Sequence, residues 1–147
     1  MSDRGATLRQ FMSSVWDHGD LAAVDRLVGP QYTIYSDPGD PWDGQTLSRE
    51  GFKERVVRSR APFPDLRFEI DRLLDGGEQI AIAWVMRGTN TVPMGDRPAT
   101  GRQIAVRGMT IYRFEGDRIV GHHQVVDRLA VAQQLGLFGP PVGGQAD

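Results

Sequence analysis

Apolar residues near the start of the chain recur at the spacing of a helix. One helix is therefore expected over residues 6–17, with a buried face made by Leu8, Phe11, Met12, Val15 and Trp16. Gly19 ends this helix, and Asp20 is a favourable N-cap for a second, shorter one. The second helix is expected to end at Gly29-Pro30, because proline cannot continue the helical hydrogen-bond pattern.

The following segment changes from a strand to a turn and then back to a helix. Residues 32–35 are rich in β-forming side chains and predict a short strand. Residues 36–41 combine prolines, a glycine and aspartates, and they form the densest turn signal in the chain. Ser48 can then cap a third helix, which is expected to end near Arg60.

From Leu66 onward the apolar positions alternate, as they do along strands with one buried face. Turn signals at Gly76-Gly77 and at residues 115–118 separate the strands into hairpins. Four long strands are expected, over residues 66–73, 79–87, 103–114 and 119–126. A last amphipathic helix is expected over residues 129–135, with Gly136 at its C-terminal end.

The order of these elements predicts an α+β domain. Three helices precede an antiparallel meander, so they are expected to pack on one face of a single sheet. A sheet of such long strands twists and curls, and helices on its concave side leave a cone with an open end. We expect this open end to be a ligand pocket. The domain is expected to span residues 1–138, followed by a mobile tail over residues 139–147.

Composition narrows the classes of function. The chain has 147 residues with a net charge of −2, and acidic and basic residues are interspersed. This balance gives no electrostatic reason to bind nucleic acid or an anionic membrane. Cysteine is absent, which excludes disulfides, thiolate nucleophiles and Cys-ligated zinc. The longest apolar run, over residues 80–86, is far shorter than the ~20 residues of a membrane helix, and a cytoplasmic protein is expected.

Several short motifs follow one another in a recognisable order. They are Trp16-x-x-Gly19-Asp20, Phe63-Pro64-Asp65-Leu66, Thr100-Gly101-Arg102, Ile111-Tyr112-Arg113, Arg118-Ile119-Val120, Asp127 and Gln134-Leu135-Gly136. As an ordered series over residues 9–138, they resemble the SnoaL-like polyketide cyclases of the nuclear-transport-factor-2-like superfamily. The resemblance covers nearly the whole chain.

The resemblance implies a cone-shaped fold and an enzyme that needs no cofactor. Such a cyclase closes a ring in a polyketide by an intramolecular aldol reaction, and Asp127 matches the family's acid/base residue. An aldol cyclisation needs a base to remove a proton next to a carbonyl and an acid to protonate the alkoxide. A partly desolvated carboxylate can do both. Asp127 is also well placed to cap the last helix, so a structural role is the alternative.

Two adjacent histidines precede Asp127 on the last strand. His122 and His123 must point to opposite faces of the sheet, because side chains alternate along a strand. Counting back by twos from Asp127 places His123 inside the cone and His122 on the other face. His123 is thus predicted to assist catalysis, with a hydrogen-bonded core histidine as the alternative. No third ligand accompanies the two histidines, so no metal site is expected.

Aromatic side chains supply candidates for a substrate cavity. Tyr35 could hydrogen-bond a substrate oxygen, and the side chains that could contact a flat apolar ligand are Trp16, Trp42, Phe63, Trp84, Met109 and Tyr112. Ordinary packing is the alternative for all of them. Asp37 and Asp65 could form an acid pair with Asp127. However, Asp37 lies in a Pro-Gly turn that favours local backbone bonds, and Asp65 matches a structural motif of the family.

Together these observations predict a cofactor-free polyketide cyclase that acts on a small hydrophobic substrate and is dimeric through the outer face of its sheet. Asp127 is the predicted acid/base, and His123 is its predicted assistant. The nearest enzymatic alternative is an epoxide hydrolase or ether-ring cyclase, which needs two carboxylates around one pocket. A cofactor-free hydroxylase and a non-catalytic binding module of the same fold are also compatible with the sequence.

Overall fold

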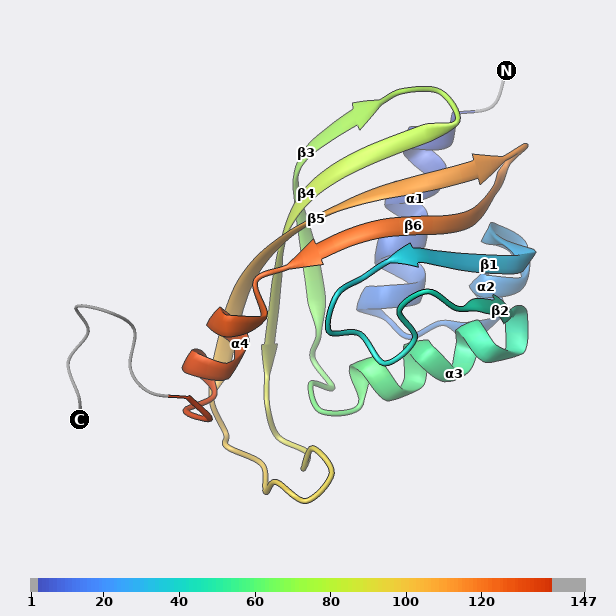
Figure 1. Cartoon of the computed structure of the whole chain (residues 1–147). Coiled ribbons are helices and arrows are strands. Elements are labelled where there is room, and N and C mark those ends of the chain that lie inside the picture. Colours follow the sequence, from blue (N-terminus) through green and yellow to red (C-terminus); the bar gives the residue numbers. More distant parts are fainter. Residues whose placement is uncertain (1–2, 139–147) are drawn as a thin grey trace.

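A six-stranded curved sheet carries helices on one of its faces (Figure 1). The computed structural model describes residues 3–138, so the tail expected over residues 139–147 lies outside the described part. The helical segments are α1 (Arg4–Phe11), its π-helical continuation η1 (Met12–Asp17), α2 (Leu21–Leu27), α3 (Arg49–Arg60) and α4 (Arg128–Gln134). The strands are β1 (Val28–Ser36), β2 (Thr46–Ser48), β3 (Arg67–Asp75), β4 (Gln79–Thr89), β5 (Gln103–Glu115) and β6 (Arg118–Val126).

The strands follow the order β2-β1-β6-β5-β4-β3 across the sheet. β3 to β6 form the expected antiparallel meander, with tight turns at Gly77 and Gly116, whose φ angles are 86° and 58°. These positive φ values favour glycine, so the turn signals had a physical basis. The prediction of an α+β fold with an antiparallel meander is confirmed. The sequence did not reveal β2 or the parallel pairing of β1 with β6.

Side-chain caps set the starts of the helices. Asp20 and Ser48 cap α2 and α3 as expected, because their side-chain oxygens accept hydrogen bonds from the first free backbone N–H groups. The first helix begins at Arg4, two residues earlier than expected, since Asp3 caps it. No helix within residues 3–138 combines the length and the apolar character that a membrane crossing requires.

The core lies between the concave face of the sheet and the helices α1, α2 and α3 (Figure 1). Phe11 of α1 and Phe52 of α3 are fully buried there, with ring centroids 6.0 Å apart. Phe11 also meets Tyr112 of β5 edge to face at 5.6 Å. The expectation that the first three helices cover the concave face is therefore confirmed.

An irregularity in β1 decides on which face Asp37 lies. Ile34 pairs with His122, but the next residue along β6 pairs with Ser36. Tyr35 is therefore an extra residue, a β-bulge, and the side chains beyond it exchange faces. As a result, Ile34 before the bulge and Asp37 after it are both fully buried.

Candidate active site

A cavity of about 240 Å³ opens between the concave face of the sheet, η1, α3, α4 and the loop that follows β1. Most of its wall is aromatic or aliphatic, including Trp16, Trp42, Phe63, Trp84, Met86 and Tyr112. The polar side chains on the wall are Asp40, Arg55, Ser59, His122, Gln124 and Arg128. An apolar cavity with a few convergent polar groups is the usual form of a small-molecule site.

Asp37 is the centre of a buried polar network behind this wall. Its Oδ2 accepts hydrogen bonds from His122 Nε2 at 2.8 Å, Gln124 Nε2 at 3.0 Å and Arg55 Nη2 at 3.3 Å. Its Oδ1 accepts one from Arg128 Nη2 at 3.3 Å. All four donors line the cavity, whereas Asp37 itself is fully buried. One carboxylate therefore fixes the orientation of four polar side chains on the wall.

Two carboxylates share the guanidinium of Arg55. Its Nη2 also donates to Asp40 Oδ2 at 2.9 Å, while Asp40 Oδ1 accepts from the backbone N of Trp42 at 2.8 Å. Burial opposes the ionisation of Asp37, but its hydrogen bond with His122 and the nearby Arg55 charge outweigh burial and lower its pKa. Asp37 is therefore a carboxylate in the fold. Among the described residues, no three His, Asp or Glu side chains form a group that could hold a metal ion.

Tyr32 fixes the tautomer of His122. The Tyr32 hydroxyl lies 2.5 Å from His122 Nδ1. Burial raises the pKa of Tyr32 well above its ordinary value, so the hydroxyl keeps its proton and donates it to Nδ1. His122 Nε2 then carries the ring proton and donates it to Asp37. Burial also lowers the pKa of His122, so the ring is neutral at neutral pH.

This buried neutral histidine predicts a pH-dependent stability. In the unfolded chain His122 gains a proton below pH ~6.5, but in the fold its pKa is lowered. The contribution of neutral His122 to the free energy of unfolding is complete above the pKa that this histidine has in the unfolded chain. It is lost as the pH falls from there toward the lower pKa of His122 in the fold. The melting temperature should fall between about pH 7.5 and pH 5, and it should fall less steeply in His122→Gln. Equal slopes for wild type and variant would contradict the assignment.

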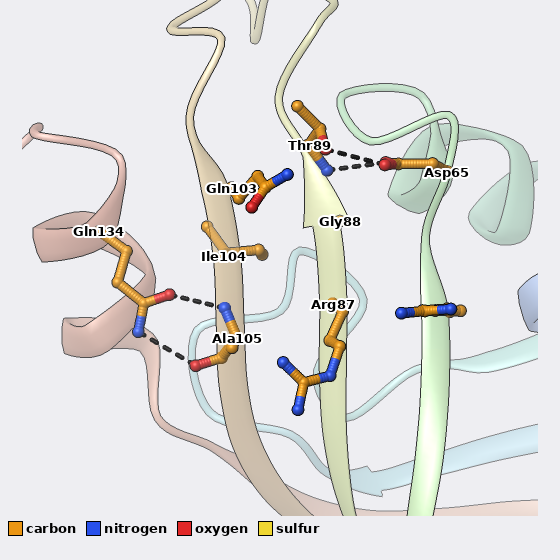
Figure 2. A pocket seen from close by; sticks show the side chains of 9 residues that line it. Asp65, Arg87, Gly88, Thr89, Gln103, Ile104, Ala105 and Gln134 are labelled. Atoms are coloured by element: carbon orange, nitrogen blue, oxygen red, sulfur yellow. Dashed lines mark hydrogen bonds between the residues drawn. The ribbon is translucent and has the colours of Figure 1, made fainter.

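A larger depression of about 630 Å³ lies on the other face of the sheet, where Arg87 and Ala105 pair across β4 and β5 (Figure 2). Several polar side chains around this depression are already used in hydrogen bonds that join neighbouring segments of the protein. Asp65 accepts hydrogen bonds from the backbone N and the hydroxyl of Thr89 at 2.7 and 2.8 Å. The Gln134 amide bonds both backbone groups of Ala105, at 2.7 and 3.0 Å, and so acts as a short substitute strand. The cavity beside α3 is therefore the better candidate site.

Comparisons with known proteins agree on one family. The SnoaL-like polyketide cyclase family matches residues 6–135, nearly the whole described chain. The chain belongs to this family.

Two solved structures of candidate polyketide cyclases are similar to this chain in sequence and fold. A candidate polyketide cyclase from Acidithiobacillus ferrooxidans is 41% identical, with a TM-score of 0.87 over 95% of this chain and 99% of that one. IdmH, a candidate polyketide cyclase from Streptomyces antibioticus, is 27% identical, with a TM-score of 0.78 over 91% of this chain and 99% of that one. No curated protein matches the chain.

The predicted catalytic pair of this SnoaL-like protein lies outside the cavity. Asp127 is exposed and caps α4, where its Oδ1 accepts from the backbone N of Ala130 at 3.0 Å. His123 is exposed on the outer face of β6, and its neighbour His122 faces the cavity. The placement of His123 in the cone was therefore wrong. His123 and Asp127 do share a face, but Asp127, which served as the reference point, points outward.

The aromatic candidates are divided between the two faces of the sheet. Trp16, Trp42, Phe63, Trp84 and Tyr112 line the cavity, as their assignment to a substrate pocket requires. Tyr35 does not, because it is the bulge residue and lies on the outer face, 44% exposed. Its ring stacks on His123 with centroids 5.0 Å apart. Met109 also faces outward, with 67% of its surface exposed.

Sequence reasoning considered Asp37 but set it aside as a turn residue, and it did not consider Asp40 as a site residue. The turn signal around them was assigned to local backbone bonds, and such bonds do occur: Asp43 Oδ1 accepts from the backbone N of Asp37 at 2.7 Å. The signal that was available is an aspartate at every third position of this turn, Asp37, Asp40 and Asp43. Three carboxylates in so short a segment require cationic or N–H partners, and here Arg55 is one of them.

Proposed function

We propose that this chain is a cofactor-independent cyclase that closes a ring in a polyketide or related natural-product intermediate by an aldol reaction. The observation that carries the proposal is the cluster of Asp37, Arg55 and Asp40, which presents a carboxylate on the wall of an aromatic cavity. Membership of the SnoaL-like family supports the reaction class. The aromatic wall supports a flat, hydrophobic substrate.

Asp40 is the general acid/base in this proposal. Its side chain lines the cavity and is 9% exposed, so a ligand can reach it. The Asp40 carboxylate takes a proton from the carbon next to a substrate carbonyl, and the electron pair of that C–H bond moves into an enolate. The enolate carbon then attacks a second carbonyl of the same molecule, and the resulting alkoxide takes the proton back from Asp40. Atoms and electrons balance without a cofactor.

Asp37 and His122 are positioning residues in this scheme. Asp37 is fully buried and cannot touch the substrate, but it holds Arg55, Gln124 and Arg128 in place on the wall. Both ring nitrogens of His122 are occupied, one by Tyr32 and one by Asp37. Rigid support of this kind keeps polar groups aimed at the reacting atoms without reorganisation during the reaction.

A deuterium-exchange experiment tests the proposal without the physiological substrate. The probe is 1-tetralone, a bicyclic aromatic ketone, in D₂O, and the intensity of its α-CH₂ signal is followed by NMR. Wild type should accelerate the exchange of these protons, and Asp40→Asn should not. Asp127→Asn tests the sequence-based assignment in the same assay. Exchange at the rate of buffer with wild-type protein would contradict enolate chemistry in this cavity.

The shared guanidinium of Arg55 also favours a second candidate function, epoxide opening. That reaction uses two carboxylates around one pocket. Asp40 lines this cavity, and Asp37 lies directly behind the wall and is linked to Asp40 through Arg55. Incubation with styrene oxide in ¹⁸O-labelled water distinguishes the two reactions. A labelled diol formed by wild type but not by Asp40→Asn, without exchange of 1-tetralone, would replace the cyclase proposal.

We further propose a homodimer formed through the outer face of the sheet. Met109 and Val125 pair across β5 and β6 and are 67% and 68% exposed, with Ile111 and Tyr35 beside them. A large apolar patch on a small protein marks an association surface, and a two-fold axis lets one patch cover its copy. Sedimentation should give a dimer for wild type and a monomer for Val125→Lys. Val57→Lys, at an exposed position of α3, should stay dimeric, and a monomeric wild type would contradict the proposal.

A further inference from the structure

Arg128 is the arginine of the cavity wall that a ligand can reach. It lines the cavity with 42% of its side chain exposed, whereas Arg55 is buried and held between two carboxylates. His122, the other basic side chain on the wall, is neutral, and both of its ring nitrogens are occupied. Among residues 3–138, a ligand in the cavity therefore meets one accessible cation, Arg128.

Two hydrogen bonds hold the guanidinium of Arg128 by one of its edges. Nε donates to the backbone oxygen of Pro38 at 2.8 Å, and Nη2 donates to Asp37 Oδ1 at 3.3 Å. The stem of the side chain lies across the turn after β1, where a Cβ at residue 39 would come within 2.5 Å of Arg128 Cδ. Gly39, with a φ of 89°, leaves this space free. The side chain is therefore fixed in place before a ligand arrives.

The end of this guanidinium has no partner in the described part of the chain. Nη1 makes no hydrogen bond there, and Nη2 uses one of its two N–H groups, on Asp37. Arginine carries five N–H donors in a planar fork, and the pair formed by Nη1 and Nη2 matches the two oxygens of a carboxylate. The two anchors use the pair formed by Nε and Nη2. The pair at the end of the side chain is thus left for a bidentate contact with a ligand.

The charges around Arg128 are compatible with an anionic ligand. Asp37 and Asp40 supply two carboxylates, and Arg55 and Arg128 supply two guanidinium groups. The network is therefore balanced as a whole and does not repel a carboxylate that approaches Arg128. Most of the remaining cavity wall is aromatic or aliphatic. Such surroundings lower the local dielectric constant, which strengthens a charge-assisted hydrogen bond relative to one on an open surface.

We propose that Arg128 binds a carboxylate of the substrate and so selects free acids over their esters and amides. This inference rests on the proposed function for the reaction that follows binding. It narrows the substrate class to flat polyketide acids that place a keto group at Asp40 and a carboxylate at Arg128. In this scheme Arg128 is a substrate-binding residue that determines specificity, and it takes no part in proton transfer.

The test compares two flat ligands that differ in charge. The probes are 2-naphthoate, which carries a carboxylate, and 2-naphthamide, a neutral molecule of almost the same shape. Isothermal titration calorimetry at neutral pH gives both dissociation constants. Wild type should bind 2-naphthoate at least about tenfold more tightly, because a charge-assisted bidentate pair is stronger than a neutral hydrogen bond. Added salt should reduce this preference, since Arg128 is partly exposed.

Arg128→Gln removes the guanidinium and keeps a polar side chain. It should lose the preference for 2-naphthoate and keep its affinity for 2-naphthamide. Arg58→Gln makes the same change at an exposed position of α3 that does not line the cavity, and it should keep the preference. Arg128→Lys retains the positive charge but cannot form the planar pair, so its affinity for 2-naphthoate should be intermediate. Circular dichroism and melting temperature report whether each variant folds.

Wild type that binds both probes equally, or binds neither, would overturn the inference, since Arg128 would then serve only as a partner of Asp37. A full preference in Arg128→Gln would place the carboxylate elsewhere. If Arg128→Gln loses 2-naphthamide as well, its cavity has changed and Arg128→Lys decides: an unchanged preference in that variant rejects the planar pair, and an intermediate one supports it.

The proposed function is judged separately, because 1-tetralone carries no carboxylate. Exchange of 1-tetralone by wild type without a preference for 2-naphthoate would retain Asp40 as the base and reject Arg128 as the specificity residue. A preference for 2-naphthoate without exchange would reject the aldol reaction and retain Arg128 as a carboxylate-binding residue.

Discussion

Replacing Asp40 with Asn is expected to lower turnover by about 10²–10⁴-fold, because the amide cannot take up the α-proton of a ketone. The amide oxygen can still accept from the backbone N of Trp42, so the loop should keep its conformation. Asp37 also still pairs with Arg55, so the guanidinium is not left without a negative partner. The rate of α-proton exchange and the melting temperature, measured together, separate loss of chemistry from loss of fold.

Asp127→Asn is the matched control for this experiment. It makes the same chemical change at an exposed helix cap, where Asn is about as good as Asp. The structure leads us to expect near-normal turnover, whereas the family resemblance assigns the acid/base role to Asp127. If Asp127→Asn loses activity and Asp40→Asn keeps it, Asp127 is the base and our assignment is wrong.

Removing the Asp37 carboxylate is expected to cost about 3–5 kcal/mol of unfolding free energy, because the buried Arg55 loses one of its two carboxylate partners and three further donors lose their acceptor. In Asp37→Ala, the buried Arg55 would keep only Asp40, and His122 Nε2 would lose its acceptor. Urea denaturation of the variant gives the change directly. Activity should fall as well, since Gln124 and Arg128 lose their common anchor.

Asp127→Ala is the control for Asp37→Ala, because it deletes a carboxylate outside the buried network. That variant also deletes a carboxylate, but it removes one exposed cap and should cost only about 1 kcal/mol. If the two variants were destabilised equally, the network around Asp37 would not be the stabilising centre that its burial and its four donors indicate.

The sequence predicts most of the fold because the relevant signals are local. Asp20 and Ser48 act through N–H groups two or three residues away, so their positions alone indicate where α2 and α3 begin. The alternation from Leu66 onward is equally local, and it predicts the meander. β1 could not be placed in the same way, because its parallel partner β6 lies far along the chain and the connection gives no turn signal.

The aromatic wall of the site could be predicted, but its polar wall could not. Trp16 and Trp84 lie on segments whose buried face is evident from periodicity. Asp37 depends on a bulge that no pattern reveals, and its partner His122 is 85 residues away. The two histidines show the same limit. Their opposite directions follow from strand geometry, but the choice of face depends on a reference residue, and Asp127 was the wrong one.

The bulge at Tyr35 makes chain length, rather than residue identity, the quantity to compare among relatives in this region. A homologue with one residue fewer between Ile34 and Asp37 would still read Asp-Pro-Gly, but the carboxylate would rotate to the outer face, away from His122. The matching arginine on α3 would then lack its buried anion. A single-residue gap at this point of an alignment therefore separates proteins with different cavities, even where every aligned side chain is the same.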